Sequence, residues 1–140
     1  MRVWDTEKRK QFVIKNQAHM RAIADIAWSV REPNILASIS ADTYINIWDI
    51  RTRSRYPAAK ASPCIWTEGH IVRWNRFDSN ILSSARDGTV DIWDLRYLQE
   101  PRRVITSHAK KLTSLEWSYQ SEKELLTSSF EPKVKVGIIY

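Results

Sequence analysis

The sequence predicts an all-β fold made of a unit of four short strands that recurs about every 44 residues. Two interleaved tryptophan series carry this period, with steps of 44 and 45 residues in the first and 46 and 43 in the second. The first series is Trp4, Trp48 and Trp93, and the second is Trp28, Trp74 and Trp117. No ten-residue segment shows helical spacing with caps, so each repeat is expected to be β throughout.

Each unit contains the same four strand signals in order. The first strand ends in tryptophan, the second follows a polar bend, and the third alternates with period two, as a half-buried strand does. The fourth strand is weaker and more polar. The expected first strands are 22–28, 70–74 and 112–117, the second 35–40, 81–85 and 125–129, the third 1–5, 44–48, 89–93 and 134–140, and the fourth 11–17, the region around Tyr56, and 102–107. Asp42-Thr43 and Asp87-Gly88 supply the tight turn before the third strand.

The spacing and the Trp-Asp endings at "INIWD" and "VDIWD" resemble the WD-repeat family, whose units form the four-stranded blades of a β-propeller. The resemblance implies that residues 1–17 are the C-terminal half of a blade, that 18–62 and 63–107 are two WD blades, and that 108–140 is an incomplete, degenerate blade. About three blades do not close a ring, since propellers typically have four to eight. Two explanations remain open: the chain is an excerpt of a larger propeller, or it assembles with copies of itself.

The resemblance also implies a hydrogen-bond network of His, Ser or Thr, Asp and Trp in each blade, with both tryptophan series mostly buried. Such groups can hold a turn in place at little cost in free energy, because each buried polar atom is hydrogen-bonded to another member of the network. In the second blade Ile65 occupies the histidine position, and in the third Glu131 replaces the aspartate and Gly137 the tryptophan. The network residues are His19, Ser38, Asp42 and Trp48 in the first full blade, Ser83, Asp87 and Trp93 in the second, and His108 and Thr127 in the third.

Enzymatic chemistry has weak support in the sequence. His19, Ser38 and Asp42 are the residue types of a hydrolase triad, but the set belongs to a repeating unit and no G-x-S-x-G elbow is present. Three histidines and one cysteine, Cys64, show no zinc-ligand spacing, and no phosphate-binding loop occurs. We therefore expect no catalytic residue, no metal and no cofactor. A single cysteine and the lack of a long apolar run favour a cytoplasmic protein without a transmembrane segment.

The net charge of +6 is concentrated in the expected loops between third and fourth strands. Three basic clusters at one repeated position predict a docking face for an acidic partner, for phosphoinositide head groups or for nucleic-acid phosphates. The alternative is that these loops are simply exposed and tolerate Lys and Arg. The residues concerned are Lys8, Arg9 and Lys10 in the first loop, Arg51, Arg53 and Arg55 in the second, and Arg96, Arg102 and Arg103 in the third.

Three longer stretches narrow the resemblance: "EPNILASISADTYINIWDIR", "VRWNRFDSNILSSARDGTVDIWDLR" and "EWSYQSEKELLTSSFE". They are similar to consecutive blades of the WD-repeat, RWD-containing subunits of the GATOR (yeast SEA) complex. This similarity implies a non-catalytic scaffold for protein–protein assembly in amino-acid signalling to the target-of-rapamycin kinase. The partners would be other subunits of the complex, and association with the lysosomal or vacuolar surface would occur only through them. The alternative is a WD-repeat adaptor that binds histones or RNA through the basic face.

Overall fold

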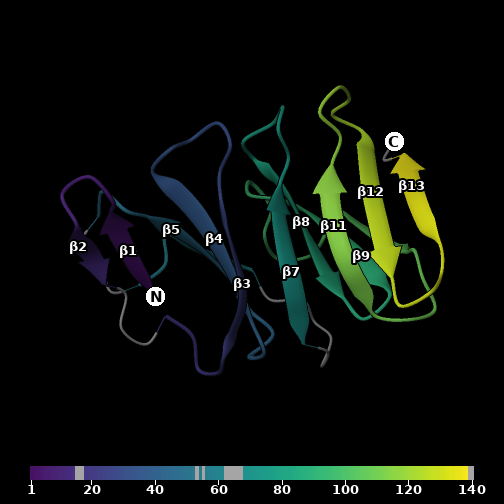
Figure 1. Cartoon of the computed structure of the whole chain (residues 1–140), viewed down its shortest axis with the longest axis horizontal. Coiled ribbons are helices and arrows are strands. Elements are labelled where there is room, and N and C mark those ends of the chain that lie inside the picture. Colours follow the sequence, from purple (N-terminus) through teal and green to yellow (C-terminus); the bar gives the residue numbers. More distant parts are fainter. Residues whose placement is uncertain (15–17, 53, 55, 62–67, 139–140) are drawn as a thin grey trace.

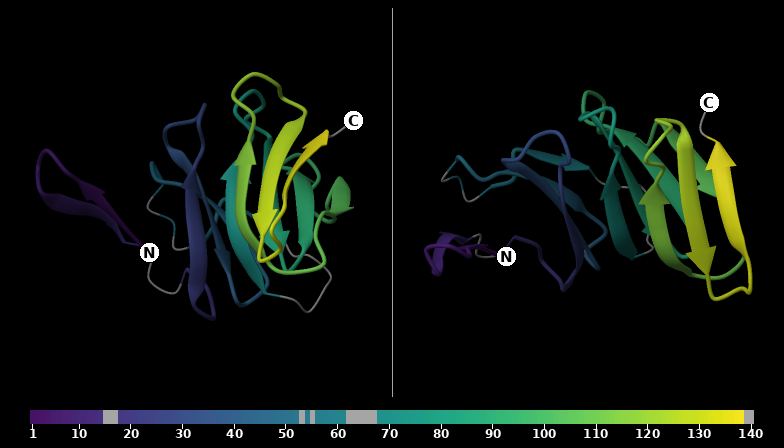
Figure 2. Two further views of the ribbon diagram at one scale, coloured as in Figure 1. Left: turned by 45° about the vertical axis from the view of Figure 1, so that its right-hand side comes forward. Right: turned by 45° about the horizontal axis from the view of Figure 1, so that its top comes forward.

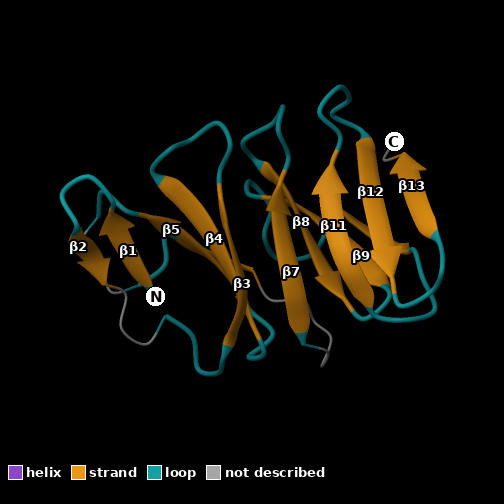
Figure 3. Cartoon of the chain, in the orientation of Figure 1, coloured by secondary structure: helices purple, strands orange, loops and turns teal. Residues whose placement is uncertain are grey.

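The computed structural model describes residues 1–14, 18–52, 54, 56–61 and 68–138. This part of the chain contains strands and connecting turns and no helix (Figure 3). The strands are β1 (Arg2–Asp5), β2 (Lys10–Ile14), β3 (Ile23–Trp28), β4 (Ile35–Ser40), β5 (Ile45–Asp49), β6 (Ala59–Ala61), β7 (Gly69–Trp74), β8 (Ile81–Arg86), β9 (Thr89–Asp94), β10 (Arg103–Thr106), β11 (Leu112–Trp117), β12 (Glu124–Ser129) and β13 (Val134–Ile138).

The strands form four antiparallel sheets, and within each sheet the spatial order equals the chain order. The orders are β1-β2, β3-β4-β5-β6, β7-β8-β9-β10 and β11-β12-β13. Figure 1 shows the sheets following one another across the molecule from the N-terminal to the C-terminal end, and Figure 2 shows that they stack rather than merge into one sheet. The described sheets do not close into a ring, as expected for part of a β-propeller.

The pairing register is the same in all three larger sheets. A leucine of the second strand faces the last core position of the third strand: Leu36 opposite Trp48, Leu82 opposite Trp93, and Leu125 opposite Gly137. Since register sets which side chains share a face, these three pairs fix the equivalent residues of the repeats.

The core lies between neighbouring sheets. One cluster joins Ile39 and Ile47 of the first full blade to Trp74 and Trp93 of the second. A second cluster joins the second blade to the third, and a smaller one packs Val3 of β1 on the first blade. Burial of each large apolar side chain contributes about 1.5–3 kcal/mol, so every sheet depends on the next for its apolar face.

One expectation about the strands needs correction, and the expected burial of most tryptophans has two exceptions. The fourth strand of the first full blade is Ala59–Ala61 rather than the region around Tyr56, because Pro57 has no N–H for the ladder and pairing starts at Ala58, whose N–H donates to the Ile47 carbonyl (2.7 Å). Trp4 and Trp28 are 58% and 47% exposed, whereas the other tryptophans of the two series are buried. Both line an open groove between β1 and β3.

Candidate functional site

The first full blade brings all four predicted network residues together. Ser38 lies on β4, Trp48 on β5, His19 in the segment before β3, and Asp42 in the β4–β5 turn. The Nε2 atom of His19 lies 2.7 Å from the Ser38 hydroxyl, and the same hydroxyl accepts the Trp48 indole N–H at 2.9 Å. Both carboxylate oxygens of Asp42 lie 3.0 Å from Nδ1 of His19. These contacts connect β4, β5, the turn between them and the segment before β3.

The protonation state of this network follows from its surroundings. Burial lowers the pKa of His19 and outweighs the opposing effect of the Asp42 carboxylate. Burial alone would raise the pKa of Asp42, but the N–H groups of Met20 and Tyr44 donate to its oxygens at 2.8 and 3.1 Å, and the net effect lowers it. At neutral pH the pair is therefore an anionic carboxylate that accepts from the Nδ1–H of a neutral imidazole. Its Nε2 then accepts the Ser38 proton.

The third blade repeats this arrangement with substitutions. His108 lies 3.0 Å from the Thr127 hydroxyl through Nε2 and 3.5 Å from Glu131 through Nδ1. Ser129 adds a contact of 3.1 Å to the same Nδ1. The N–H of Ala109 donates to Glu131 at 2.8 Å, as that of Met20 does to Asp42. Glutamate thus occupies the place of the aspartate, and its longer side chain reaches the same two groups.

Gly137 stands where the other blades have tryptophan, and the hydroxyl of the third blade has no indole donor there. Thr127 instead donates to the carbonyl of Lys135 on the neighbouring strand at 3.4 Å. The third-blade network therefore holds the loop before β11 and the turn after β12, but it fixes β13 only through this long hydrogen bond.

In the second blade the serine that meets the tryptophan is Ser84, not Ser83. The Trp93 indole donates to the Ser84 hydroxyl at 2.9 Å, whereas the Ser83 hydroxyl points to the carbonyl of Arg73 at 3.3 Å. Both blades place the serine two residues after the leucine that faces the tryptophan, so Ser84 is the equivalent of Ser38. The β8–β9 turn is one residue shorter than the β4–β5 turn, because Arg86 faces Thr89 directly. The serine therefore lies nine residues before Trp93 but ten residues before Trp48.

Asp87 lies in that tight turn with a left-handed φ of 47°, next to Gly88. A side chain on Gly88 would collide with the backbone carbonyl of His108, whose N–H in turn donates to the Gly88 carbonyl at 3.0 Å. The turn thus packs on the loop of the following blade. The Asp87 side chain is exposed, and it does not take the place that Asp42 has in the first blade. Ile65, the residue expected at the histidine position, lies outside the described residues, as do Cys64, Arg53 and Arg55.

A buried ion pair that the sequence analysis missed is present in the same blade. Arg86 donates from Nε and Nη2 to the two oxygens of Asp91 at 2.6 and 3.0 Å, and Asp91 is completely buried. Asp91 faces Ser84 across the ladder, as Asn46 faces Ser38 in the first blade. The sequence did contain a sign of this pair: Ser40 and Asn46 of the first blade are replaced by Arg86 and Asp91 at the equivalent positions of the second.

The triad-like trio does not have the surroundings of a hydrolase site. Ser38 has 0% exposure, and its oxygen already accepts the Trp48 N–H. A nucleophile must reach a substrate in a cleft, and a hydroxyl enclosed between two strands cannot do so. The same His–hydroxyl contact recurs at His108 and Thr127. The arrangement is suited to holding a turn rather than to acyl transfer.

Most of the described members of the basic clusters fall in connections between third and fourth strands, but the arginines differ in what they contact. Arg51 donates to both oxygens of Asp49, and Arg96 does the same to Asp94, each with a closest distance of 2.6 Å. In both blades the arginine two residues after Trp-Asp therefore clamps that aspartate. Of the remaining members, Lys8 and Arg9 lie in the β1–β2 turn, and Lys10 is the first residue of β2 and its side chain is not described. Arg102 directly precedes β10, and Arg103 is the first residue of that strand.

A cavity of about 260 Å³ opens beside this last pair of arginines, between the second and third blades. Buried Ile81, Ile92 and Trp117 line its inner part, while Arg102 and Arg103 stand at its mouth. Sequence reasoning placed the two arginines in an exposed loop but not beside a cavity, because the cavity is formed by strands and loops of two different repeats.

Comparison with known proteins agrees with this geometry. The family description "WD domain, G-beta repeat" matches residues 10–49 and 63–94. A WD repeat-containing protein of Dictyostelium discoideum is 38% identical over 136 residues, which is 96% of this chain and 7% of the relative. The Drosophila melanogaster GATOR2 complex protein Wdr59 is 34% identical over 94% of this chain and 13% of its own length, and human GATOR2 complex protein WDR59 is 39% identical over 81% and 11%. The chain thus spans about a tenth of the length of these relatives.

Within the described segments, no helix has the length and apolar character needed to cross a membrane.

Proposed function

The chain belongs to the WD domain, G-beta repeat family, and on that premise we propose that it is a non-catalytic scaffold for the assembly of a GATOR-like multiprotein complex. The observation that carries the proposal is similarity to GATOR2 complex proteins along nearly the whole chain rather than at the repeat signature alone. Trp-Asp and the network residues are common to many WD repeats, whereas an extended match also includes loops and outer faces, which are the surfaces available to partners.

The internal architecture supports a rigid scaffold. Neighbouring blades are joined by hydrogen bonds between their first strands, β3, β7 and β11, as well as by apolar packing. The Trp74 indole donates to the Ala27 carbonyl at 3.0 Å, and the Arg73 guanidinium pairs with Asp25 at 2.5 Å. The Trp117 indole reaches the Arg73 carbonyl at 3.4 Å. A scaffold must hold its loops in fixed relative positions, and cross-blade bonds of this kind do that.

We place the complex in amino-acid signalling to the target-of-rapamycin kinase, at the lysosomal or vacuolar surface. The support is the resemblance to GATOR subunits, and the chain would reach that surface through its partner subunits. The buried network residues then have a structural role, because they set the turns that partners contact. His19, Ser38, Asp42 and Trp48 do this in the first blade, and His108 with Thr127 in the third.

The second candidate is an adaptor that binds RNA or histones through the basic loops. Its support is the surplus of Lys and Arg in the connections between third and fourth strands. The pairing of Arg51 with Asp49 and of Arg96 with Asp94 weakens it, because a clamped guanidinium has fewer donors for phosphate. Exposed Tyr56 and Tyr97 near these loops are the aromatic groups that base stacking would need.

The discriminating experiment is affinity capture of the tagged full chain from its own cells in a series of salt concentrations. A scaffold should retain the same protein partners, including other propeller proteins, between about 50 and 200 mM salt. A protein held by phosphate contacts should lose orders of magnitude in affinity over that range. Nuclease treatment serves as the matched control. Partners that disappear with salt or with nuclease would contradict the scaffold proposal and favour the adaptor.

A further inference from the structure

The cavity between the second and third blades has a polar frame that is already satisfied. Asn75, which is buried, donates from Nδ2 to the Glu122 carbonyl at 2.9 Å and so connects the β7–β8 loop to the β11–β12 loop. Its Oδ1 accepts the N–H groups of Phe77 and Asp78 at 2.8 and 3.0 Å. The Trp117 indole is directed to Arg73 of the neighbouring strand. The polar atoms of this frame are therefore satisfied within the protein, and Ile81, Ile92 and Trp117, each at most 8% exposed, close the inner end of the cavity.

The mouth of the cavity carries more available positive than negative charge. Arg102, Arg103 and Lys123 line it and are exposed, and no ion pair to a carboxylate is found for them among the described residues. Of the nearby carboxylates, Asp78 accepts from the N–H and the side-chain amide of Asn80. Glu122 is the other carboxylate at the mouth. Three cations thus face two carboxylates, which leaves the mouth with an excess of one positive charge.

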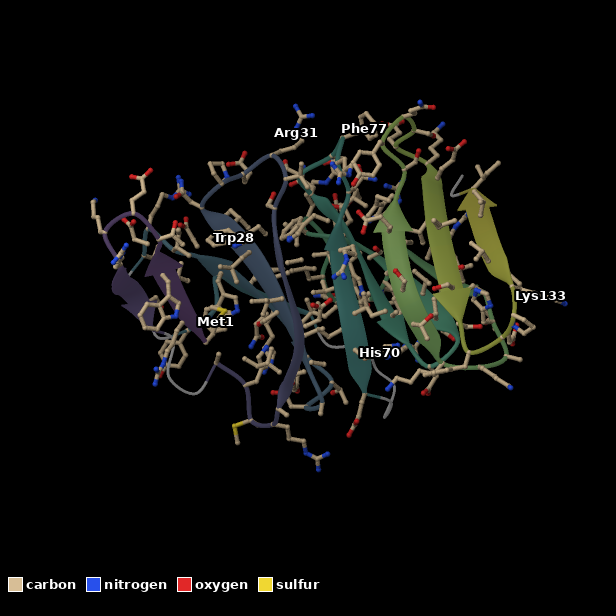
Figure 4. All side chains as sticks on the ribbon, in the orientation of Figure 1. Met1, Trp28, Arg31, His70, Phe77 and Lys133 are labelled. Carbon is tan, nitrogen blue, oxygen red and sulfur yellow. The ribbon has the colours of Figure 1, made fainter. Side chains whose placement is uncertain are left out.

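The position of the cavity fits a docking role. It lies at the end of the molecule where the loops after the tryptophan-ending strands gather. Figure 4 marks this edge by Arg31 and Phe77, on the side away from His70. Phe77 and Tyr119, which belong to two of these loops, are exposed, and Arg76 stacks on the Tyr119 ring at 3.6 Å. Aromatic residues and arginine are the types enriched in the centre of protein interfaces.

We propose that this cavity binds a short acidic segment of a partner protein, with an acidic side chain on Arg102 and Arg103 and a neighbouring apolar side chain on Ile81, Ile92 and Trp117. Charge complementarity selects the acid, since a guanidinium offers paired donors that match a carboxylate. The volume of 260 Å³ lies below the range of about 300–1,000 Å³ typical of small-molecule sites, which favours a single side chain as the occupant. The inference deepens the proposed scaffold by naming the chemistry of one partner segment.

The test measures binding of a fluorescent peptide, Glu-Asp-Leu-Asp-Phe-Glu, to the full chain by anisotropy. Reversing both arginines (Arg102→Glu with Arg103→Glu) should weaken binding at least tenfold, a loss of about 1.4 kcal/mol that corresponds to one charge-assisted contact. The matched control reverses Lys110 and Lys111, an adjacent exposed pair at the opposite end of β11. It should change affinity less than twofold. All four side chains are exposed, and thermal melting checks that both variants fold.

The apolar part is tested on the peptide, which avoids refolding problems in the protein. Replacing its leucine and phenylalanine by alanine should also weaken binding, and equal affinity would overturn the cavity as the binding site. Equal losses in the two charge-reversed proteins would show diffuse attraction and overturn the proposal as well. So would tighter binding of a ten-nucleotide uridine RNA or of inositol hexakisphosphate that depends on the same two arginines. If the peptide fails while salt-resistant capture of subunits persists, this inference is wrong and the scaffold stands.

Discussion

The assignment of Ser84 rather than Ser83 as the partner of Trp93 makes a direct prediction for two adjacent serines. We compare Ser84→Ala with Ser83→Ala, two substitutions that each remove one oxygen from a buried position of β8. The first removes the acceptor of the Trp93 indole, while the second removes a donor to the Arg73 carbonyl. The chemical change is identical and both positions are buried, so the hydrogen bond that is lost is the main difference between the two variants.

The magnitudes follow from what each change leaves behind. Trp93 has 0% exposure, so after Ser84→Ala its N–H has neither the hydroxyl nor water, and a buried unsatisfied donor costs about 1–3 kcal/mol. After Ser83→Ala the Arg73 carbonyl loses a contact of 3.3 Å but keeps the Trp117 indole N–H at 3.4 Å. The loss should be below about 1 kcal/mol, at the low end for a net hydrogen bond.

Urea unfolding followed by tryptophan fluorescence measures both effects. With a slope of about 1–3 kcal/mol per molar urea, typical of small proteins, Ser84→Ala should lower the midpoint by roughly 1 M and leave the slope unchanged. Ser83→Ala should move it by a few tenths of that. If Ser83→Ala is the more damaging substitution, the strand register does not identify the partner of Trp93. Ser83, which was expected from its distance of ten residues to Trp93, would then be the network residue.

Three further outcomes are expected. Asp91→Asn should destabilise the full chain by about 3 kcal/mol in urea unfolding, because it leaves the Arg86 cation buried without its carboxylate. Adding Arg86→Ser restores the residue types of the first blade and should recover at least half of the lost stability. If no stability is recovered, the pairing of Arg86 with Asp91 is contradicted. Trp74→Phe should cost about 1–3 kcal/mol by losing the cross-blade bond to the Ala27 carbonyl, and a neutral result would show that the bond does not stabilise the stack. Because burial lowers the pKa of His19 below 6.5, the folded state binds fewer protons than the unfolded state. The free energy of unfolding should therefore be level above pH 6.5 and fall as the pH drops from 6.5 toward the folded-state pKa. His19→Asn should reduce that decline and leave the part due to His70, whose pKa burial also lowers.

The sequence predicted the strands well because strand and turn signals are local. Period-two alternation and tryptophan spacing located β5 and β9, and the polar bends located the starts of β4 and β8. The error at the fourth strand around Tyr56 has a local cause too. A three-residue alanine-rich strand carries almost no alternation, so only Pro57 indicated where pairing cannot begin.

The parts that could not be predicted depend on contacts between repeats. The burial of a tryptophan depends on whether another sheet covers it, and nothing in the residues around Trp28 distinguishes it from buried Trp74. The Arg86–Asp91 pair was missed because two charged residues five apart on facing strands meet only once the register is known. The cavity beside Arg102 is formed by two repeats and has no signature in either.

The two tryptophan series look alike in the sequence, but the hydrogen bonds of one lie within a sheet and those of the other run between sheets. Trp48 and Trp93 donate to a serine of their own sheet, so they hold the third strand to the second. Trp74 and Trp117 donate instead to the carbonyl that precedes the tryptophan of the blade before, at Ala27 and at Arg73. One series fixes the inside of a blade and the other fixes the step to the next.

This division shows where the stack of blades is held together, because the Trp74 and Trp117 bonds run between consecutive sheets. The third and second blades meet through a longer indole bond than the second and first, 3.4 against 3.0 Å, and the cavity lies at that looser junction. Binding of an acidic segment there would bridge two blades across their weaker contact, so the stability of the third blade should rise with ligand occupancy.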